Sequence, residues 1–277
     1  MKPIALSIAG SDPSGGAGIQ ADLRTFDAHG CHGATVLTAI TLQNTLGVQA
    51  VHALEASWVE RQLDVVLDDL TAAAIKTGML AGEPIVEAVC RRLERRGRAP
   101  WVCDPVLAAS SGARLLDDAG WRALRAKGLP LVDLWTPNAD EAAQWTGLTI
   151  EDAADAERAA RRIVEQGAAA VLVKGGHLRR DRGTDVLASR RLGVRRFTVE
   201  PLQVQHAHGS GCVYSAAITA RLAEGHGLER AIELGKRFVT EALRHGRALG
   251  RGVGPVDPRW ATSVPPVPDA SVPRGRP

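Results

Sequence analysis

The stretch IALSIAGSDPSGGAGIQADLRTFDAH, residues 4–29, decides how the chain folds. Its apolar start, residues 4–9, predicts a buried strand, and the glycine-rich segment 10–18 that follows predicts a tight turn. Residues 19–29 then carry the apolar spacing of a helix. A strand, a turn and a helix in this order form the repeating unit of α/β folds with a parallel sheet.

The same unit recurs along the chain. Further strands are expected at residues 34–42, 74–76, 101–103, 131–135 and 170–173, and helices at 58–67, 85–95, 119–126, 153–166 and 228–243, with another helix beginning at 141–145. Short strands are expected at 47–54, 184–188 and 194–199, the last two antiparallel at one edge. We therefore predict a three-layer α/β/α fold with a mostly parallel central sheet and helices on both faces. The apolar and β-branched run 34–42 is expected to be buried on both faces.

The first glycine-rich turn does not match the common nucleotide-binding motifs. It is not a P-loop, because no Gly-Lys-Ser or Gly-Lys-Thr closes it. Residues 16–21 satisfy the dinucleotide pattern Gly-x-Gly-x-x-Ala, but five residues separate Gly10 from Gly16. The next strand also ends in Gln43, where a ribose-binding acid is expected. A dinucleotide site is therefore a minor alternative.

A second glycine-bearing turn, HGSGCVYSAA at residues 208–217, leads directly into a helical pattern. The first amides of a helix have no partner within the helix, so Gly209, Ser210 and Gly211 can let a phosphoryl group approach the backbone. Cys212 falls in the first helical turn, where the helix dipole can lower a thiol pKa and produce a thiolate base. The alternative is a shaped loop in which Cys212 is a small buried hydrophobic residue.

Two further polar positions are open to more than one interpretation. Gln43 and Asn44 follow a predicted strand, and ligands of open α/β sheets bind outside the carboxyl ends of strands, so the pair is a candidate for contacting a polar heterocycle. A simple turn at Asn44 explains the pair equally well. Asp22 lies among apolar neighbours in the predicted helix, and a solvated surface acid is its ordinary interpretation.

Composition excludes several classes of protein. The 277 residues carry 34 basic and 31 acidic side chains, and the basic clusters are dispersed, which argues against a nucleic-acid interface. The four cysteines are far apart, with no metal-binding spacing, and fit a reducing cytoplasm. No run approaches the length of a membrane helix. We expect one domain over residues 1–257 and a proline-rich, disordered tail over 258–277.

Several motifs, taken together and in order, resemble one family. They are AGSDPSGGAGIQAD at residues 9–22, QNT at 43–45, KTGML at 76–80, DPV at 104–106, TPNADEA at 136–142, VKGGH at 173–177 and the turn 209–212. The set is similar to the hydroxymethylpyrimidine/phosphomethylpyrimidine kinases of thiamine biosynthesis, which belong to the ribokinase-like kinases. The match runs from residue 4 to about 258.

The resemblance implies a pyrimidine pocket and a nucleotide side. The pocket positions are Gly10, Ala17, Asp22, Gln43, Met79 and Val106. Asp22 and Gln43 would bind the ring nitrogens and the exocyclic amine, because a carboxylate and an amide supply the acceptors and donors that an aminopyrimidine requires. Lys174 and Asn138 match the nucleotide side, while Glu141 and Asp104 are the expected carboxylates for Mg²⁺.

The resemblance also implies a mechanism with ATP as co-substrate. Cys212 would accept the proton of the substrate hydroxyl, and the amides of residues 209–212 would stabilise charge on the transferred phosphoryl group. The family's ribokinase-like relatives act on small molecules, and the resemblance suggests a homodimer, with neither nucleic acid nor membrane as a partner.

The chain departs from the family pattern at three positions. Ala207 and Ser210 replace threonines of the usual Thr-His-Gly-Thr-Gly-Cys sequence, and Ser210 keeps the hydroxyl. Ser110 stands where a lysine is usual, which leaves open whether one or both phosphorylation steps are catalysed. Two rival functions are a pyridoxal kinase of the same fold and a non-catalytic pyrimidine-binding regulator; the intact glycine turn argues against the regulator.

Overall fold

The structure is a computed structural model that describes residues 2–95, 97–109 and 111–260. Its strands form one sheet in the order β3-β2-β1-β4-β5-β6-β7-β8-β9. The strands are β1 Ile4–Ser11, β2 His32–Asn44, β3 Gly47–Ala53, β4 Ala74–Thr77, β5 Trp101–Cys103, β6 Leu134–Trp135, β7 Ala170–Val173, β8 Thr184–Ser189 and β9 Gly193–Thr198. Pairing is parallel from β2 to β7, whereas β3, β8 and β9 are antiparallel to their neighbours.

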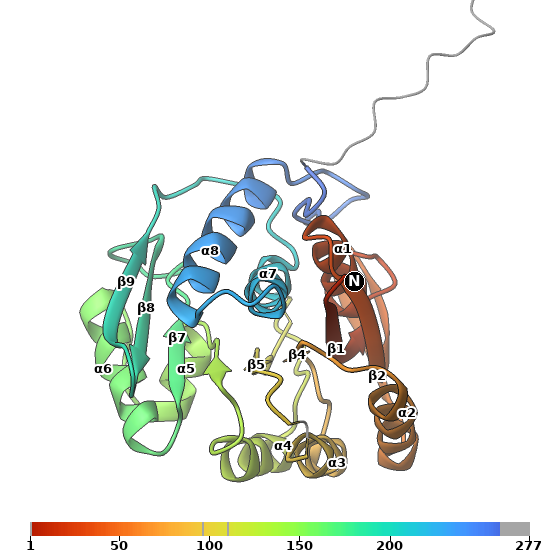
Figure 1. Cartoon of the computed structure of the whole chain (residues 1–277). Coiled ribbons are helices and arrows are strands. Elements are labelled where there is room, and N and C mark those ends of the chain that lie inside the picture. The colour runs from red at the N-terminus through yellow and green to blue at the C-terminus, as the bar shows by residue number, and fades with distance from the viewer. Residues whose placement is uncertain (1, 96, 110, 261–277) are drawn as a thin grey trace, which may run out of the picture.

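Helices cover both faces of this sheet, as Figure 1 shows. They are α1 Gly18–Ala28, α2 Ala56–Asp69, α3 Glu83–Leu93, α4 Asp118–Ala123, α5 Ala139–Thr146, α6 Ala153–Glu165, α7 Ser210–Ala223 and α8 Leu228–Arg244. A π-helical turn, η1 Leu124–Gly128, continues α4. Helices α1, α7 and α8 pack together on one face, and α2 to α6 lie on the other. The predicted three-layer α/β/α fold is confirmed.

Local sequence signals explain where several elements begin. The Asp117 and Asp152 carboxylates accept backbone N–H groups in the first turns of α4 and α6, which is the usual capping chemistry. Strands β5 and β7 have the predicted bounds. Strand β6 is shorter than the predicted 131–135, because the N–H groups of Leu131 and Val132 donate to the carbonyl of Gly128 in a turn.

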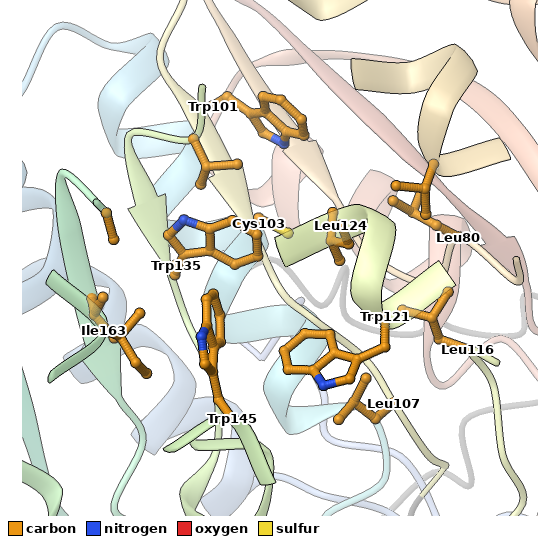
Figure 2. Close-up of a cluster of buried hydrophobic side chains, with 14 of the residues drawn as sticks. Leu80, Trp101, Cys103, Leu107, Leu116, Trp121, Leu124, Trp135, Trp145 and Ile163 are labelled. Atoms are coloured by element: carbon orange, nitrogen blue, oxygen red, sulfur yellow. The ribbon is translucent and has the colours of Figure 1, made fainter. Parts of the chain in front are cut away.

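The larger core cluster lies on the α2 to α6 face and contains most of the tryptophans (Figure 2). The ring of Trp145 meets those of Trp135 and Trp121 edge to face, with centroids 4.9 and 5.1 Å apart. Trp101 is fully buried and donates its indole N–H to Thr77 at 2.9 Å. These four indoles are therefore core side chains and form no surface platform for nucleic-acid bases.

The burial of strand β2 differs from the prediction. Residues 34–42 are not buried on both faces, because Ile40 and Leu42 are 46% and 62% exposed. This half of β2 pairs with β3 at the edge of the sheet. Alternation along the strand turns Thr41 and Gln43 toward the cavity described below, so Ile40 and Leu42 point to the opposite side.

The carboxyl-terminal boundary is also corrected. The predicted disordered tail began at residue 258, but Pro258 is buried and Trp260 packs on the smaller core cluster. The ring of Trp260 stacks on His245 with centroids 5.5 Å apart. The packed part of the chain therefore reaches at least residue 260. The prediction for residues 261–277 lies outside the described residues.

None of the helices within the described ranges has the length and apolar character needed to cross a membrane.

Candidate active site

A cavity of about 300 Å³ opens at the carboxyl ends of the parallel strands. The chain leaves β1 toward β2 on one side and later returns to β4 on the other, so the strand order reverses at β1. Crevices at such reversal points are the usual ligand sites of open α/β sheets. The segments that follow β1, β4, β5 and β7 all contribute to the lining, together with the beginning of α7.

The cavity gathers all of the residues that the sequence predicted for the site except Asp22 and Asn44, whose side chain accepts the Leu46 N–H in an exposed turn. Its lining includes Gly10, Ala17, Gln43, Met79, Val106, Asp104, Asn138, Glu141, Lys174, Gly209, Ser210, Gly211 and Cys212. Asp22 is absent from the lining. Ser110, the position of the usual lysine, lies outside the described residues.

The glycine turn before α7 has the geometry that its sequence predicts. Gly209 is the N-cap of α7 with φ of 77°, a left-handed conformation that favours glycine. A side chain at Gly209 would come within 1.8 Å of the carbonyl oxygen of Gly16, so the two glycine-rich turns touch through their backbones. No side chain caps α7; the Ser210 N–H donates to the Ala207 carbonyl at 3.2 Å, and residues 209–212 line the cavity.

Cys212 lies in the first turn of α7 and is partly exposed to the cavity, whereas Cys31, Cys90 and Cys103 are buried. Cys212 also packs against the smaller core cluster, so it is a partly buried residue at the boundary between the core and the cavity. The expected low thiol pKa is wrong for this state of the site, because burial raises the pKa of Cys212. The Lys76 ammonium acts in the opposite direction and favours the thiolate.

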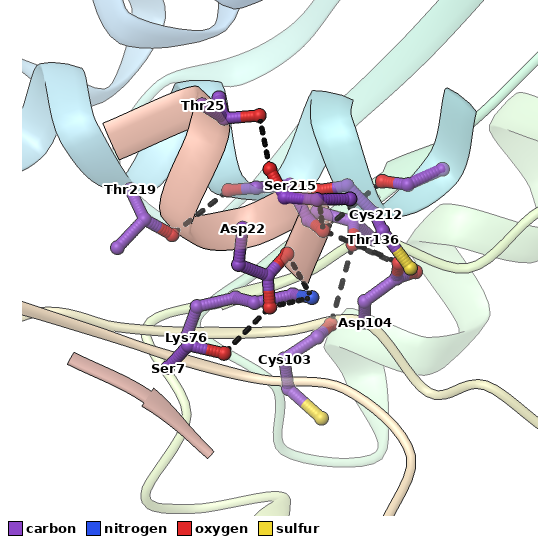
Figure 3. A network of polar contacts seen from close by, with 12 residues as sticks. Ser7, Asp22, Thr25, Lys76, Cys103, Asp104, Thr136, Cys212, Ser215 and Thr219 are labelled. Carbon is purple, nitrogen blue, oxygen red and sulfur yellow. Dashed lines mark hydrogen bonds and ion pairs between the residues drawn. The ribbon is translucent and has the colours of Figure 1, made fainter. Parts of the chain in front are cut away.

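Asp22 and Lys76 form an ion pair beneath the cavity (Figure 3). Both side chains are 0% exposed, and the Lys76 ammonium lies 2.8 Å from each carboxylate oxygen of Asp22. The Ser7 hydroxyl donates to the same carboxylate at 2.5 Å. The predicted direct contact of Asp22 with a ring is thus not supported, because its carboxylate is covered and already paired. The surface interpretation of Asp22 is wrong as well.

Lys174 and Asp104 form a second ion pair, next to the glycine turn. Their Nζ and Oδ1 atoms are 2.6 Å apart. A side chain built at Gly211 would lie 3.4 Å from the Lys174 Nζ, so the ammonium stands beside the first amides of α7. The Ser215 hydroxyl donates to the other oxygen of Asp104 at 3.2 Å (Figure 3). A cation beside the start of a helix makes an anion-binding centre.

Asn138 and Glu141 form a capping box at the start of α5. The Glu141 N–H donates to the Asn138 side chain at 2.8 Å, and the Asn138 N–H donates to the Glu141 carboxylate at 2.7 Å. Burial raises the pKa of Glu141 to about 7, and the nearby Asp104 carboxylate adds to this rise. Within the described ranges, no three His, Cys, Asp or Glu side chains gather as a metal site.

Asp12 and His208 line the cavity, although the sequence analysis gave neither a role. The His208 Nε2 is 2.8 Å from an Asp12 carboxylate oxygen and 3.3 Å from the side-chain nitrogen assigned to Gln43. Proximity in sequence was the available signal, because Asp12 lies in the first glycine-rich turn and His208 immediately precedes the second. Lys76 was also missed, although a charged residue directly after the apolar run 72–75 of a predicted strand was a usable signal.

A third buried ion pair lies at the end of the cavity formed by β8 and α8. The Lys236 ammonium is 2.7 Å from an Asp185 oxygen, and the N–H of Gly175 donates to the other oxygen at 2.8 Å. A side chain at Gly175 would come within 1.8 Å of the Thr184 carbonyl oxygen. Asp185 therefore holds the turn that follows Lys174, and only glycine fits there.

The arrangement can bind a flat polar ring and an anionic group in one space. Gln43, Met79 and Val106 line the same cavity as the glycine turn and Lys174. The thiol of Cys212 is the nucleophilic or basic group at this turn. Together these groups fit transfer of a phosphoryl group to a small heterocyclic alcohol.

Comparisons with known proteins agree with this chemistry. A family model described as phosphomethylpyrimidine kinase matches residues 12–257. A hydroxymethylpyrimidine/phosphomethylpyrimidine kinase of Staphylococcus aureus (strain MRSA252) is 43% identical over 260 residues, covering 93% of this chain and 94% of that protein. The phosphomethylpyrimidine kinase of Clostridium difficile 630 has a similar structure, with a TM-score of 0.77 and 38% identity over 87% of this chain and 99% of that chain. An ADP complex of Bacillus subtilis pyridoxal kinase has a TM-score of 0.86 and 34% identity, covering 94% and 99%.

Proposed function

The chain belongs to the phosphomethylpyrimidine kinase family, and we propose that its cavity holds the pyrimidine ring directly beside the glycine turn that receives the phosphoryl group. The protein is a hydroxymethylpyrimidine/phosphomethylpyrimidine kinase of thiamine biosynthesis. The observation that carries the proposed site is the shared cavity, in which Gln43, Met79 and Val106 face the same space as Gly209 to Cys212.

In the proposed reaction the substrate hydroxyl oxygen forms a bond to the γ-phosphorus of ATP, and the bond from that phosphorus to the leaving ADP oxygen breaks. Cys212, as thiolate, takes the hydroxyl proton. The first amides of α7 and the Lys174 ammonium stabilise the charge on the transferred group, since both lie at the same point of the cavity. Because burial raises the pKa of the Cys212 thiol, only a fraction of the enzyme carries the thiolate near neutral pH.

Mg²⁺ fits the acidic side of this cavity. Asp104 and Glu141 both line it; one Asp104 oxygen is bound to Lys174 and the other accepts the Ser215 hydroxyl, and one Glu141 oxygen accepts the Asn138 N–H, but a carboxylate oxygen has a second lone pair for a cation. A magnesium ion keeps several waters and takes only one or two carboxylates, so this pair is sufficient. When bound, the ion would neutralise charge on the nucleotide phosphates. The Lys174 ammonium holds Asp104 in place for that role.

Turnover with three acceptors tests the proposal. ADP formation should be measured with hydroxymethylpyrimidine, its monophosphate and pyridoxal, each with ATP and Mg²⁺. We expect a clear preference for the pyrimidines. Binding of hydroxymethylpyrimidine without any ADP formation would support the regulator instead. Comparing the first two acceptors decides whether one or both phosphorylation steps are catalysed, which the serine at position 110 leaves open.

Pyridoxal kinase activity is the second candidate, because of the structural similarity to the Bacillus subtilis pyridoxal kinase. That TM-score of 0.86 exceeds the value of 0.77 for the Clostridium difficile phosphomethylpyrimidine kinase. The fold therefore suits either ring, and discrimination depends on the polar side chains around the ring. A higher kcat/KM for pyridoxal than for hydroxymethylpyrimidine would favour this candidate.

We also propose that the enzyme is a cytoplasmic homodimer. The β2–β3 hairpin supports a dimer, because Ile40, Leu42 and Leu46 expose apolar side chains on it. Replacing Ile40 and Leu42 by lysine should yield monomers in analytical ultracentrifugation. The four free cysteines agree with a reducing compartment.

A further inference from the structure

The Asp12 carboxylate is the centre of a network that joins the two glycine-rich turns. One of its oxygens accepts the N–H and the hydroxyl of Ser14, at 2.9 and 2.7 Å. The other accepts the N–H of Ala17 at 2.8 Å and faces the His208 Nε2 at 2.8 Å. Asp12 is only 2% exposed, so these contacts are its principal partners. The network fixes the His208 ring at the edge of the cavity.

The Asp12 carboxylate determines that the Nε2 nitrogen of the His208 ring carries a hydrogen. Burial alone would raise the pKa of Asp12, but the hydrogen bonds from His208 and Ser14 lower it to about 2. An ionised carboxylate can only accept, so the His208 Nε2 must carry a hydrogen and donate it. This holds for the neutral and the protonated ring alike. The Nε2 atom therefore has no lone pair to offer to Gln43.

The amide of Gln43 is then mismatched at both ends when its nitrogen faces His208 and its oxygen faces Thr41. Its Nε2 is a donor that lies 3.3 Å from the His208 Nε2, which is also a donor. Its Oε1 is an acceptor 3.2 Å from the Thr41 hydroxyl, whose single hydrogen is directed to the Ser11 carbonyl at 2.8 Å. Amide oxygen and nitrogen are distinguished by their hydrogen-bond partners. Turning the amide by 180° corrects both contacts at once.

We propose that the Asp12–His208 pair locks the Gln43 amide with Oε1 toward His208 and Nε2 toward Thr41, and thereby fixes the order of donor and acceptor that the pocket offers to the ring. In this orientation the His208 Nε2–H donates to Gln43, and Gln43 donates to the free lone pair of the Thr41 hydroxyl. His208 is a positioning residue in this network, because it acts on the ring through Gln43. The inference rests on the proposed function, in which Gln43 faces the pyrimidine.

The locked amide makes the pocket selective between two closely related edges. An aminopyrimidine presents an N–H donor beside an unprotonated ring nitrogen, while its oxo analogue presents an acceptor beside a ring N–H. An amide that can turn over suits both edges, whereas a locked amide suits one. Sites built around one hydrogen-bond pattern reject the other because the buried polar groups are left unpaired.

The test compares kcat/KM for the 4-amino substrate and for its 4-oxo analogue. His208→Leu removes the donor to Gln43 and should lower the amino-to-oxo ratio by about tenfold or more, since one mismatched hydrogen bond changes binding by roughly that factor. Thr41→Val removes the other anchor and should lower the ratio in the same direction. If His208→Leu does not fold, the ratio measured for Thr41→Val tests the proposal. A general loss of positioning would reduce both substrates equally and leave the ratio unchanged.

His206→Leu is the matched control. His206 lies two residues before His208, and its Nδ1 accepts the N–H of Gly254 at 3.1 Å, but it does not line the cavity. This variant loosens the same segment and should keep the wild-type ratio. An unchanged ratio in both His208→Leu and Thr41→Val overturns the proposal, provided that Gln43→Ala weakens binding of the amino substrate. If Gln43→Ala binds that substrate normally, the error lies in the proposed pocket itself.

Discussion

Replacing Lys76 by methionine should destabilise the protein strongly, because it leaves the Asp22 carboxylate buried without its cation. Both side chains are 0% exposed, and the ammonium bonds both carboxylate oxygens at 2.8 Å. Removing one partner of such a pair typically costs about 3–5 kcal/mol. For a domain of this size, 1 kcal/mol corresponds to about 2–4 °C, so Tm should fall by about 6–20 °C.

The loss should grow with pH. Burial raises the pKa of Asp22 above its ordinary value of 3.8, and removal of Lys76 raises it further, so the folded variant keeps a proton that the unfolded chain releases. A folded state that binds the extra proton becomes less stable as pH rises above 3.8, by about 1.4 kcal/mol per unit until the raised pKa is reached. The stability deficit relative to wild type should therefore be smaller at pH 5 than at pH 7.

Urea unfolding at pH 5, 6 and 7 measures this deficit. Lys76→Met combined with Asp22→Leu removes both charges and should lie within about 1–2 kcal/mol of wild type, as expected when an apolar pair replaces a buried ion pair. Arg91→Met is the exposed control, since Arg91 and Glu60 are 60% and 40% exposed and such pairs contribute about 0–1 kcal/mol. A single-variant loss below 1 kcal/mol, or one that does not change with pH, would refute the reasoning.

Three further predictions concern the active site, the chain end and a buried acid. Cys212→Ala should lower turnover, measured by ADP release, by about two to four orders of magnitude with little change in Tm. Cys212→Asp should retain more activity than Cys212→Ala. The kcat of the wild-type enzyme should rise with pH as the thiolate forms. Deleting the chain after Trp260 should preserve Tm, whereas deletion after Gly252 should lower both Tm and turnover, because Val256 is buried beside His208. Glu141→Gln should flatten the stability profile by calorimetry. The pKa of Glu141 is raised to about 7 from 4.5, so its contribution is complete below 4.5 and disappears as pH rises through 7.

Glycines and apolar periodicity are local signals, and they predicted the strand–turn–helix order and the glycine turn before α7, whereas most of the other cavity residues were predicted by the resemblance to a family. The turn at Gly209 illustrates the local signals, since it depends on neighbours within four residues. Asp22 shows the opposite case. Its partner Lys76 is 54 residues away, and no local pattern announces that a helix and a strand will bury the two together.

The exposure of side chains at the sheet edge and the pKa of the Cys212 thiol also depend on distant parts of the chain, which no local pattern reveals. Ile40 and Leu42 have the composition of a core strand, but exposure depends on which helices reach that edge. A helix start alone suggests a low pKa for Cys212, whereas the surrounding protein removes water from the thiol and reverses the direction. Pairings across the chain, such as that of Asp12 with His208, required the folded structure.

The backbone pairing of His208 with the last described segment has a consequence for synthesis of the protein. The N–H of His208 donates to Gly254, and that of Val256 donates back to His208, while the His208 ring holds Asp12 near the amino end. At a translation rate of about 5–20 residues per second, the ribosome takes about 12–50 s to proceed from Asp12 to Val256. Throughout that interval the nascent chain has no complete pocket, so neither the vitamin precursor nor ATP can stabilise the folded state until residues 254–256 have emerged.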